Sequence, residues 1–295
     1  IIIPHKNSAD LLEYCLSTIP MRDDVQVIVV DDNSDPQKVD FDHFPQWKGK
    51  NYEYYLTKEG KGAGYARNVG LEHAVGKWIL FVDADDFLLP TINDIFNENI
   101  DSEADIIYFR PQAVMLEDRK TPSHRADAYN DIIDEYFCSG DETKLRVRFF
   151  SPTCKIIKRN LIEENEIRFD EIKYSNDVLF AVKIGCKANT IQVRQECYYV
   201  ITECNNSLRA NYNKKEGESE IRSDAFFRAS EILIQNGYSF NSQEGYYYLN
   251  LLLLKNKKLF VKQFRWISKT MKCSTAKLLH ELFKTNRWQT KIKRS

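Results

Sequence analysis

The sequence lacks the features that mark several large classes of protein. It has no run of eighteen or more apolar residues, so no membrane-spanning helix is predicted. Its seven cysteines are odd in number and never spaced as C-x-x-C, which argues against a disulfide framework or a zinc site. No internal repeat or low-complexity segment occurs. What remains is an ordinary globular composition, 43% hydrophobic and 29% charged over 295 residues, which suits one large domain or a domain with an appendage.

The chain opens on IIIP, inside a strand-like run and without a methionine. We therefore expect a few residues to precede Ile1, and a removed signal peptide stays open. The scattered cysteines favour a reducing compartment, so the expected location is the cytoplasm, with a peripheral position on the inner face of the plasma membrane as the alternative.

The net charge of −1 conceals an uneven distribution. Residues 255–295 carry ten Lys and three Arg against the single acid Glu281, or +12, which leaves −13 for residues 1–254. A basic tail on an acidic body indicates a polyanionic partner, and a solvated basic face is the plainer alternative. We expect peripheral contact of the basic C-terminal helices with an anionic membrane and no nucleic acid partner.

The order of apolar and polar runs predicts an α/β fold. β-branched runs that end in polar residues alternate with segments whose apolar residues recur at helical spacing, the first of which has Ser8 as its expected N-cap. Such alternation predicts a mostly parallel sheet with flanking helices and ligands at the carboxyl ends of its strands. The predicted strands are 1–4, 25–32, 51–57, 77–85, 104–110 and 190–202, and the predicted helices are 8–19, 62–75, 91–100 and 175–188.

The last part of the chain has a different character. After about residue 215 no strand pattern occurs, and apolar and basic residues alternate at helical spacing over 219–236 and 243–285. We therefore predict two domains, an α/β domain over 1–215 and an all-helical basic region over 216–295.

Acidic residues gather at predicted ends of strands and helices. They are Asp31 and Asp32, then Asp83, Asp85 and Asp86 in DADD, and then Asp177. Alternate carboxylates after a strand can converge on Mg²⁺ or Mn²⁺, which proteins commonly hold by one or two carboxylates together with substrate phosphates. The plainer reading of an isolated DxDD is a loop in which an Asp caps the next helix.

Taken together and in order, these segments resemble the family-two inverting nucleotide-sugar glycosyltransferases with the GT-A fold. The resemblance covers about residues 1–208. It rests on IIIPHKNSADLLEYCLSTI, VQVIVVDDNSDP, GAGYARNVGLEHAVGKWILFVDADDFLLP, IRFDEIKYSNDVLFAVKIGCKA and YYVITECNNSL. It implies a Rossmann-like, mostly parallel sheet with flanking helices, followed here by a C-terminal all-helical extension.

The resemblance also implies residues that bind the donor. Pro4 ends the first strand against the nucleoside, and Asp32 accepts a hydrogen bond from uracil N3. Its neighbour Asp31 is a cap or turn residue. Arg67 meets the ribose or a phosphate, with a surface ion pair as the alternative. Lys6 stands where the family commonly has Tyr, so base stacking is not expected there and contact with phosphate is the alternative.

The DADD segment corresponds to the DxD motif of the family. By that resemblance Asp85 is the ligand of Mn²⁺ or Mg²⁺, and Asp83 faces the ribose or the sugar and can join it as a ligand. Asp86 is either a supporting acid or the cap of the next helix, and we favour the cap.

Asn176-Asp177 stands where the family usually carries an acidic pair. Asp177 is then the general base that takes the proton of the acceptor hydroxyl. The neutral Asn176 should keep the pKa of Asp177 lower than in an acidic pair. The plainer reading, an Asp at a helix N-terminus favoured by the dipole, is compatible with this role.

The resulting prediction is an inverting, metal-dependent enzyme that moves a sugar from a nucleotide sugar, most simply a UDP-sugar, to a glycan or lipid-linked oligosaccharide in bacterial cell-surface polysaccharide biosynthesis. Processive synthesis is not expected, because Gln263-Phe264-Arg265-Trp266 lacks the Q-x-x-R-W spacing and reads as a helix face. Two alternatives stay open. A sugar nucleotidyltransferase would need a glycine-rich first turn, which HKNSADLL lacks, and a non-catalytic binding protein would not need all of these acids.

Overall fold

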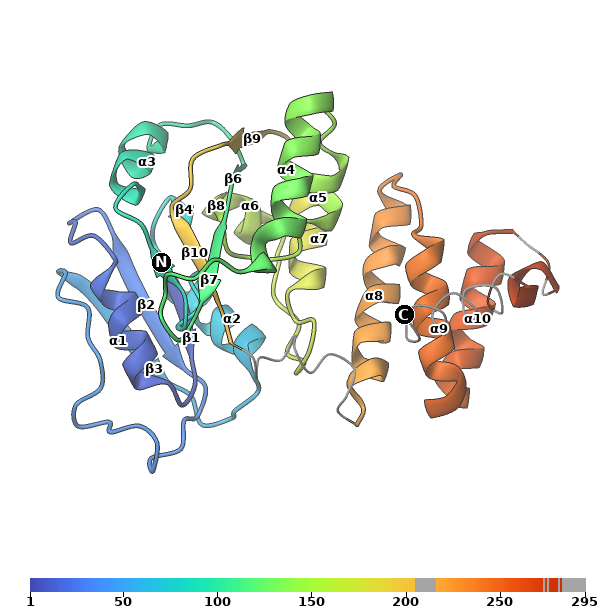
Figure 1. Cartoon of the computed structure of the whole chain (residues 1–295), viewed down its shortest axis with the longest axis horizontal. Helices are drawn as coiled ribbons and strands as arrows, with labels where there is room; N and C mark the ends of the chain where they lie inside the picture. Colours follow the sequence, from blue (N-terminus) through green and yellow to red (C-terminus); the bar gives the residue numbers. More distant parts are fainter. Residues whose placement is uncertain (205–215, 273, 275, 281, 283–295) are drawn as a thin grey trace. The chain divides into compact units, whose positions relative to one another are not determined.

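The computed structural model describes residues 1–204, 216–272, 274, 276–280 and 282. The chain divides into two compact units, residues 1–210 and 211–295, both drawn in Figure 1. The predicted boundary near 215, residues 205–208 of the family resemblance and the last part of the basic tail lie at or outside the limits of the described residues.

The first unit is built on a parallel sheet whose strands are adjacent in the order β1-β2-β3. Valine and isoleucine fill β2, which is buried along almost all of its length, as a strand covered on both faces must be. The predicted β-α-β-β-α order is confirmed, although β1 runs through His5, so Pro4 does not end it. The elements are β1 (Ile2–His5), α1 (Ala9–Ser17), β2 (Gln26–Asp31), β3 (Asn51–Leu56) and α2 (Ala63–His73).

A short segment on the other side of β1 completes this sheet. Ile2 donates to the carbonyl of Leu80 (2.9 Å) and accepts from the amide of Val82 (3.0 Å), so residues 80–82 run parallel to β1. The chain thus passes from β1 outward to β3 and then returns to the opposite side of β1. In open α/β sheets ligands bind at the carboxyl ends of the strands next to such a reversal. Asp83 follows this segment directly.

Two predicted strands are each wrong as single elements. The run 77–85 changes partner midway, because β4 pairs antiparallel with β8 before residues 80–82 reach β1. The run 190–202 is two strands in different sheets, one paired with β6 and the other with β5 and β7. The strands are β4 (Trp78–Ile79), β5 (Phe87–Leu88), β6 (Ile106–Phe109), β7 (Gln112–Met115), β8 (Lys155–Lys158), β9 (Ile191–Arg194) and β10 (Tyr199–Glu203).

Helices surround these sheets, and α4, α5 and α7 lie together as Figure 1 shows. Between residues 111 and 150 the chain forms β7, η1, α4 and α5. The first unit has the helices α3 (Ile92–Asn99), η1 (His124–Ala126), α4 (Asp127–Ser139), α5 (Thr143–Arg148), α6 (Arg159–Glu164) and α7 (Val178–Lys187).

The second unit is helical in its described part, with α8 (Glu218–Gln235), α9 (Ser242–Lys255) and α10 (Lys257–Thr270). The predicted continuous helix from 243 is interrupted at Asn256, whose side chain accepts from the amide of Leu259 and caps α10. Aromatic side chains from all three helices form a separate apolar core. Among the described residues, no helix is both long and apolar enough to cross a bilayer.

Candidate active site

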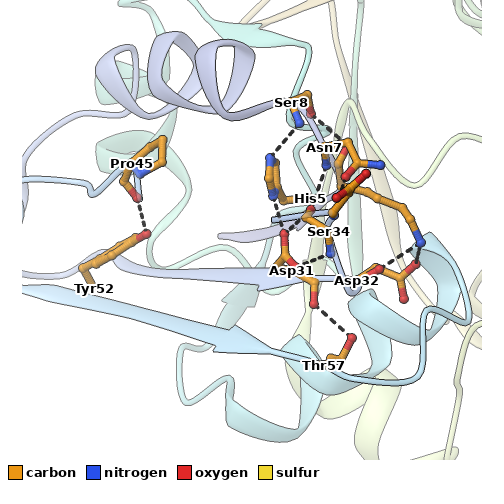
Figure 2. A network of polar contacts seen from close by, with 11 residues as sticks. His5, Asn7, Ser8, Asp31, Asp32, Ser34, Pro45, Tyr52 and Thr57 are labelled. Atoms are coloured by element: carbon orange, nitrogen blue, oxygen red, sulfur yellow. Dashed lines mark hydrogen bonds and ion pairs between the residues drawn. The ribbon is translucent and has the colours of Figure 1, made fainter. Parts of the chain in front are cut away.

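The end of β2 holds a buried hydrogen-bond network centred on Asp31 (Figure 2). His5 Nδ1 lies 2.7 Å from Asp31 Oδ2, and the amide of Ser8 donates to His5 Nε2 at 3.1 Å. Because Nε2 accepts, the ring proton lies on Nδ1 and points to Asp31. Ser34 donates to the same carboxylate through its hydroxyl (2.5 Å) and its amide (2.8 Å). Burial alone would raise the pKa of Asp31, but the hydrogen bonds from His5 and Ser34 together hold that pKa below its ordinary value.

We expect Asp31→Asn to lower the free energy of unfolding by about 2–4 kcal/mol, because an amide leaves buried donors of this network without an acceptor. Since the pKa of Asp31 is lowered on folding, the stabilisation is present above the unfolded value of 3.8 and is lost as pH falls through the folded pKa. Denaturant unfolding of wild type and variant at pH 7 and pH 3 measures this. The exposed Asp42→Asn is the control, and a gap between wild type and Asp31→Asn that does not narrow at pH 3 would contradict the assignment.

Asp32, the next residue, has one oxygen that is satisfied and one that is not. Its Oδ2 accepts from Lys6 Nζ (3.1 Å) and from the amide of Gly62 (2.9 Å), and Lys6 also binds the Asp32 carbonyl at 2.9 Å. Its Oδ1 is buried and has no hydrogen-bond partner. A buried carboxylate oxygen without a donor is costly, so this geometry points to a donor supplied by a ligand. Lys6 holds Asp32 rather than standing free for a phosphate.

Arg67 links the acidic turn at 83–86 to the start of α7. Its Nη2 donates to Asp83 Oδ1 at 2.6 Å and its Nη1 to Asn176 Oδ1 at 3.1 Å, and its guanidinium lies over the ring of Phe169. The arginine is 6% exposed, so it is not the surface ion pair considered above. Its Nε is also buried without a partner.

Two glycines allow α2 to carry Arg67 into this position. Gly62, before the helix, has φ +100°, a conformation that residues with a Cβ rarely adopt. A Cβ on Gly64 would lie 2.2 Å from the carbonyl oxygen of Asp170, so only glycine lets the first turn of α2 approach that segment.

The three acids of the DADD segment have three different environments. Asp83 is paired with Arg67 and is 38% exposed. Asp86 is buried and accepts from the hydroxyl of Tyr199 (2.7 Å) and the amide of Thr202 (2.7 Å). Burial, followed by the charges of Asp85 and Asp83, raises the pKa of Asp86 well above its ordinary value. The prediction that Asp86 caps a helix is wrong, because its oxygens are used by β10.

The Asp85 side chain reaches solvent, but many protein atoms lie close around it and displace part of the water that would hydrate its carboxylate. That loss of hydration, and then the negative charge of Asp83, raise the pKa of Asp85 to about 6, while Arg125 and Arg67 act in the opposite direction. Arg125, in η1, has a buried Nη1 without a hydrogen-bond partner.

The donor set fits a cation held mainly by Asp85. Within the described residues no cluster of three His, Cys, Asp or Glu side chains could enclose a metal ion. Magnesium and manganese, however, are often bound by one or two carboxylates and completed by substrate phosphates. Asp85 is open for that role, whereas Asp83 already shares its Oδ1 with Arg67.

Asp177 lies at the N-cap of α7, and its side chain makes no capping hydrogen bond. Burial raises the pKa of Asp177, Asp83 adds to the increase, and Arg67 and Lys155 oppose it. The position agrees with the plainer reading of a residue at a helix N-terminus. Because the carboxylate does not cap the helix, it can still act on a substrate. The role of general base stays a prediction.

Several polar residues at the site carried no recognisable signal in the sequence. Tyr199 and Thr202 lie in YYVITECNNSL, one of the segments that carry the family resemblance, but no role was predicted for either residue, and both contact the DADD turn. Lys155 is buried between the rings of Tyr108 and Phe149, with Nζ donating to the carbonyl of Phe149 at 2.6 Å. Burial lowers the pKa of Lys155 to about 7.

Comparison with known proteins shows what this chain is similar to. The family profile described as Glycosyl transferase family 2 matches residues 1–165. A poly(ribitol-phosphate) beta-glucosyltransferase of Bacillus spizizenii is 29% identical over 217 residues, 68% of this chain and 32% of that protein. The poly(ribitol-phosphate) beta-N-acetylglucosaminyltransferase TarP of Staphylococcus aureus is 24% identical over 229 residues, 74% of this chain and 67% of that one. The chain therefore spans about a third of the length of the Bacillus relative.

Solved structures show the same fold. Residues 1–349 of S. aureus TarS in complex with UDP-GlcNAc superpose with a TM-score of 0.61 at 21% identity, covering 90% of this chain and 78% of that one. The mannosyltransferase PcManGT from Pyrobaculum calidifontis, in complex with GDP-Man and Mn²⁺, gives a TM-score of 0.52 at 18% identity and covers 98% and 82%.

Proposed function

Since the chain belongs to glycosyl transferase family 2, we propose that it transfers a sugar from a nucleotide sugar to a glycan of the bacterial cell surface, with inversion at the anomeric carbon. The observation that carries this proposal is the link made by Arg67, which joins Asp83 to the residue beside Asp177. Through it Asp83, on the donor side of the site, is connected to Asn176, the residue next to the proposed general base, although the two are far apart in the sequence.

The proposed donor is a UDP-sugar. Uracil N3–H is a hydrogen-bond donor of the kind that the unpartnered Oδ1 of Asp32 lacks. The TarS structure similar to this chain holds UDP-GlcNAc, which is consistent with uridine as the base.

Asp32→Asn tests the donor assignment. Lys6 and Gly62 both donate to Oδ2, so the amide oxygen of the asparagine should occupy that place. Its NH₂ group should then face uracil N3–H, and two hydrogen-bond donors would oppose each other. UDP affinity is expected to fall about 10-fold or more. CDP, whose N3 accepts, should lose less. Calorimetric titration of UDP and of CDP into wild type and variant measures the effect. In a thermal-shift panel of UDP-, GDP- and dTDP-sugars with and without Mn²⁺, wild-type protein that responds to none of them would contradict the proposed function.

In the proposed reaction, Asp177 accepts the proton of the acceptor hydroxyl as that oxygen attacks the anomeric carbon. The bond from this carbon to the diphosphate breaks, and a nucleoside diphosphate leaves. Asp85, with Asp83 beside it, would hold Mg²⁺ or Mn²⁺, which supplies positive charge to the leaving diphosphate. Arg67 fixes the position of Asp83 relative to Asn176 through its two hydrogen bonds.

The proposed acceptor is a cell-surface polymer. Both curated relatives described above are named for poly(ribitol-phosphate), so a polyol-phosphate chain of the teichoic acid class is the first candidate. A lipid-linked oligosaccharide is the other candidate. A transfer assay with each acceptor distinguishes them.

For the helical unit we propose peripheral contact with anionic lipid. Lys258, Lys262, Arg265 and Lys269 recur on one exposed face of α10, while Ile267 and its apolar neighbours pack in the core of the unit. Replacing the four cations by glutamine is expected to abolish most partition onto vesicles containing anionic lipid. Equal partition of wild type and variant would contradict it.

A further inference from the structure

One hydroxyl of β10 contacts both ends of the turn that carries Asp83 and Asp85. Tyr199 Oη accepts from the amide of Asp83 at 3.0 Å and donates to Asp86 Oδ2 at 2.7 Å. The Tyr199 side chain is fully buried and lies 116 residues away from Asp83 in the sequence. The amide of Asp86 also donates to the Asp83 carbonyl at 3.0 Å, which closes the turn on itself.

Thr202, on the same strand, holds the remaining part of the turn. Its hydroxyl donates to the Asp85 carbonyl at 2.9 Å, and its amide donates to Asp86 Oδ1 at 2.7 Å. Backbone pairing adds to this attachment, because β5 follows the turn and runs antiparallel to β10 through Tyr199 and Val200. The backbone of the turn is therefore fixed from β10, and the carboxylates of Asp83 and Asp85 are the parts left free of it.

The direction of each hydrogen bond makes Tyr199 hard to replace. The amide of Asp83 can only donate, so Tyr199 Oη accepts there, and its own proton is directed to Asp86 Oδ2. A tyrosine hydroxyl satisfies both at once, since it has one donor and free lone pairs. Phenylalanine would leave a backbone amide and a buried carboxylate oxygen without partners at opposite ends of the same turn.

From this geometry we propose that Tyr199, assisted by Thr202, is the positioning residue that sets the DADD turn for the donor diphosphate and its cation. The proposal rests on the proposed function, because it takes Asp83 and Asp85 as the residues that meet those groups. Residues that support metal-binding side chains commonly change metal affinity about 10–100-fold when they are replaced. Fixing the turn in advance reduces the reorganisation that diphosphate binding would otherwise require.

The adjacent tyrosine provides a matched control. Tyr198 is also buried, and its hydroxyl donates to the carbonyl of Lys155 at 3.2 Å instead of to the acidic turn. Tyr198→Phe therefore removes one buried hydroxyl from the residue directly before β10 without removing a hydrogen bond to DADD. Thr202→Val is a second, milder variant, which removes the bond to the Asp85 carbonyl and keeps the amide bond to Asp86.

The test is calorimetric titration of UDP, with and without Mn²⁺, into wild-type protein and these three variants. With Mn²⁺ present, Tyr199→Phe is expected to weaken UDP binding about 10-fold or more and Thr202→Val less strongly, while Tyr198→Phe stays within about 2-fold of wild type. Without Mn²⁺, all four proteins are expected to bind UDP with the same affinity, since the uracil is bound by Asp32, which these substitutions do not change.

Three results would overturn the proposal. Wild-type affinity of Tyr199→Phe in Mn²⁺ is one, and equal losses in Tyr199→Phe and Tyr198→Phe are another. If Tyr199→Phe does not fold, Thr202→Val decides, and an unchanged affinity in that variant is the third. Wild-type protein that binds no nucleotide sugar would instead contradict the proposed function, so the two failures can be told apart.

Discussion

Replacing Asp177 by asparagine is expected to lower kcat by about 10²–10⁴-fold, the usual contribution of a general base. Asparagine is nearly the same size and keeps the N-cap position of α7, so the fold should persist. The carboxylate makes no capping hydrogen bond in the wild-type protein, so stability should change little. The affinity for the nucleotide sugar should be largely retained, because the proposed contacts with uracil and with the diphosphate are made by Asp32 and by the DADD turn. Transfer assays and UDP titration on one preparation measure both.

The pH profile gives the same variant a second readout. Burial, and then Asp83, raise the pKa of Asp177 above the ordinary value of 3.8. A base must be ionised to take a proton, so kcat/KM should fall as pH drops through this raised pKa. The residual rate of Asp177→Asn should lack that dependence. Glu171→Gln, an exposed acid of the preceding loop, is the control that should keep wild-type rate and profile. A turnover of Asp177→Asn near that of wild type would contradict the assignment of Asp177 as the general base.

Much of the fold was predictable because its strands are buried on both faces. The β-branched runs that became β1 and β2 can be recognised from composition alone. Partner choice cannot be recognised in this way. The apolar run at 77–85 reads as one strand, but β4 pairs with β8, and residues 80–82 pair with β1. The spacing of apolar residues in the sequence indicates which residues are buried, but it does not indicate which strand pairs with which.

The site shows the same division between local and distant information. The order of motifs indicated Asp32, Arg67, Asp83 and Asp177, and the structure joins Asp83 to the residue beside Asp177 through Arg67. Asp86 was interpreted as either a supporting acid or the cap of the next helix, and the cap was favoured because Asp is a preferred N-cap residue. Its actual partners are on β10, more than a hundred residues away. Hydrogen bonds over such separations leave no local pattern, so the segment of Tyr199 and Thr202 could be recognised by its resemblance to the family, but their contacts with the DADD turn could not be predicted.

Asp85→Asn is expected to remove the dependence of UDP binding on Mn²⁺ and to lower the rate of transfer by about 10³-fold, since a catalytic cation is worth several kcal/mol of transition-state stabilisation. The reason lies in the contrast between two neighbours. Asp83 has its charge partly compensated by Arg67 at 2.6 Å, whereas Asp85 is exposed and has a pKa raised to about 6. A carboxylate that is poorly compensated by the protein gains most from a cation.

The comparison with Asp83→Asn makes this prediction specific. Loss of the Asp83 charge should weaken donor binding and leave Arg67 without its ion pair, but part of the response to Mn²⁺ should remain, because Asp85 is still present. Asp94→Asn, an exposed acid in the first turn of α3, should behave as wild type. Calorimetry of UDP with increasing Mn²⁺ ranks the three variants. If Asp85→Asn keeps the full metal-dependent affinity while Asp83→Asn loses it, the ligand is Asp83, and Arg67 must release it when the cation binds.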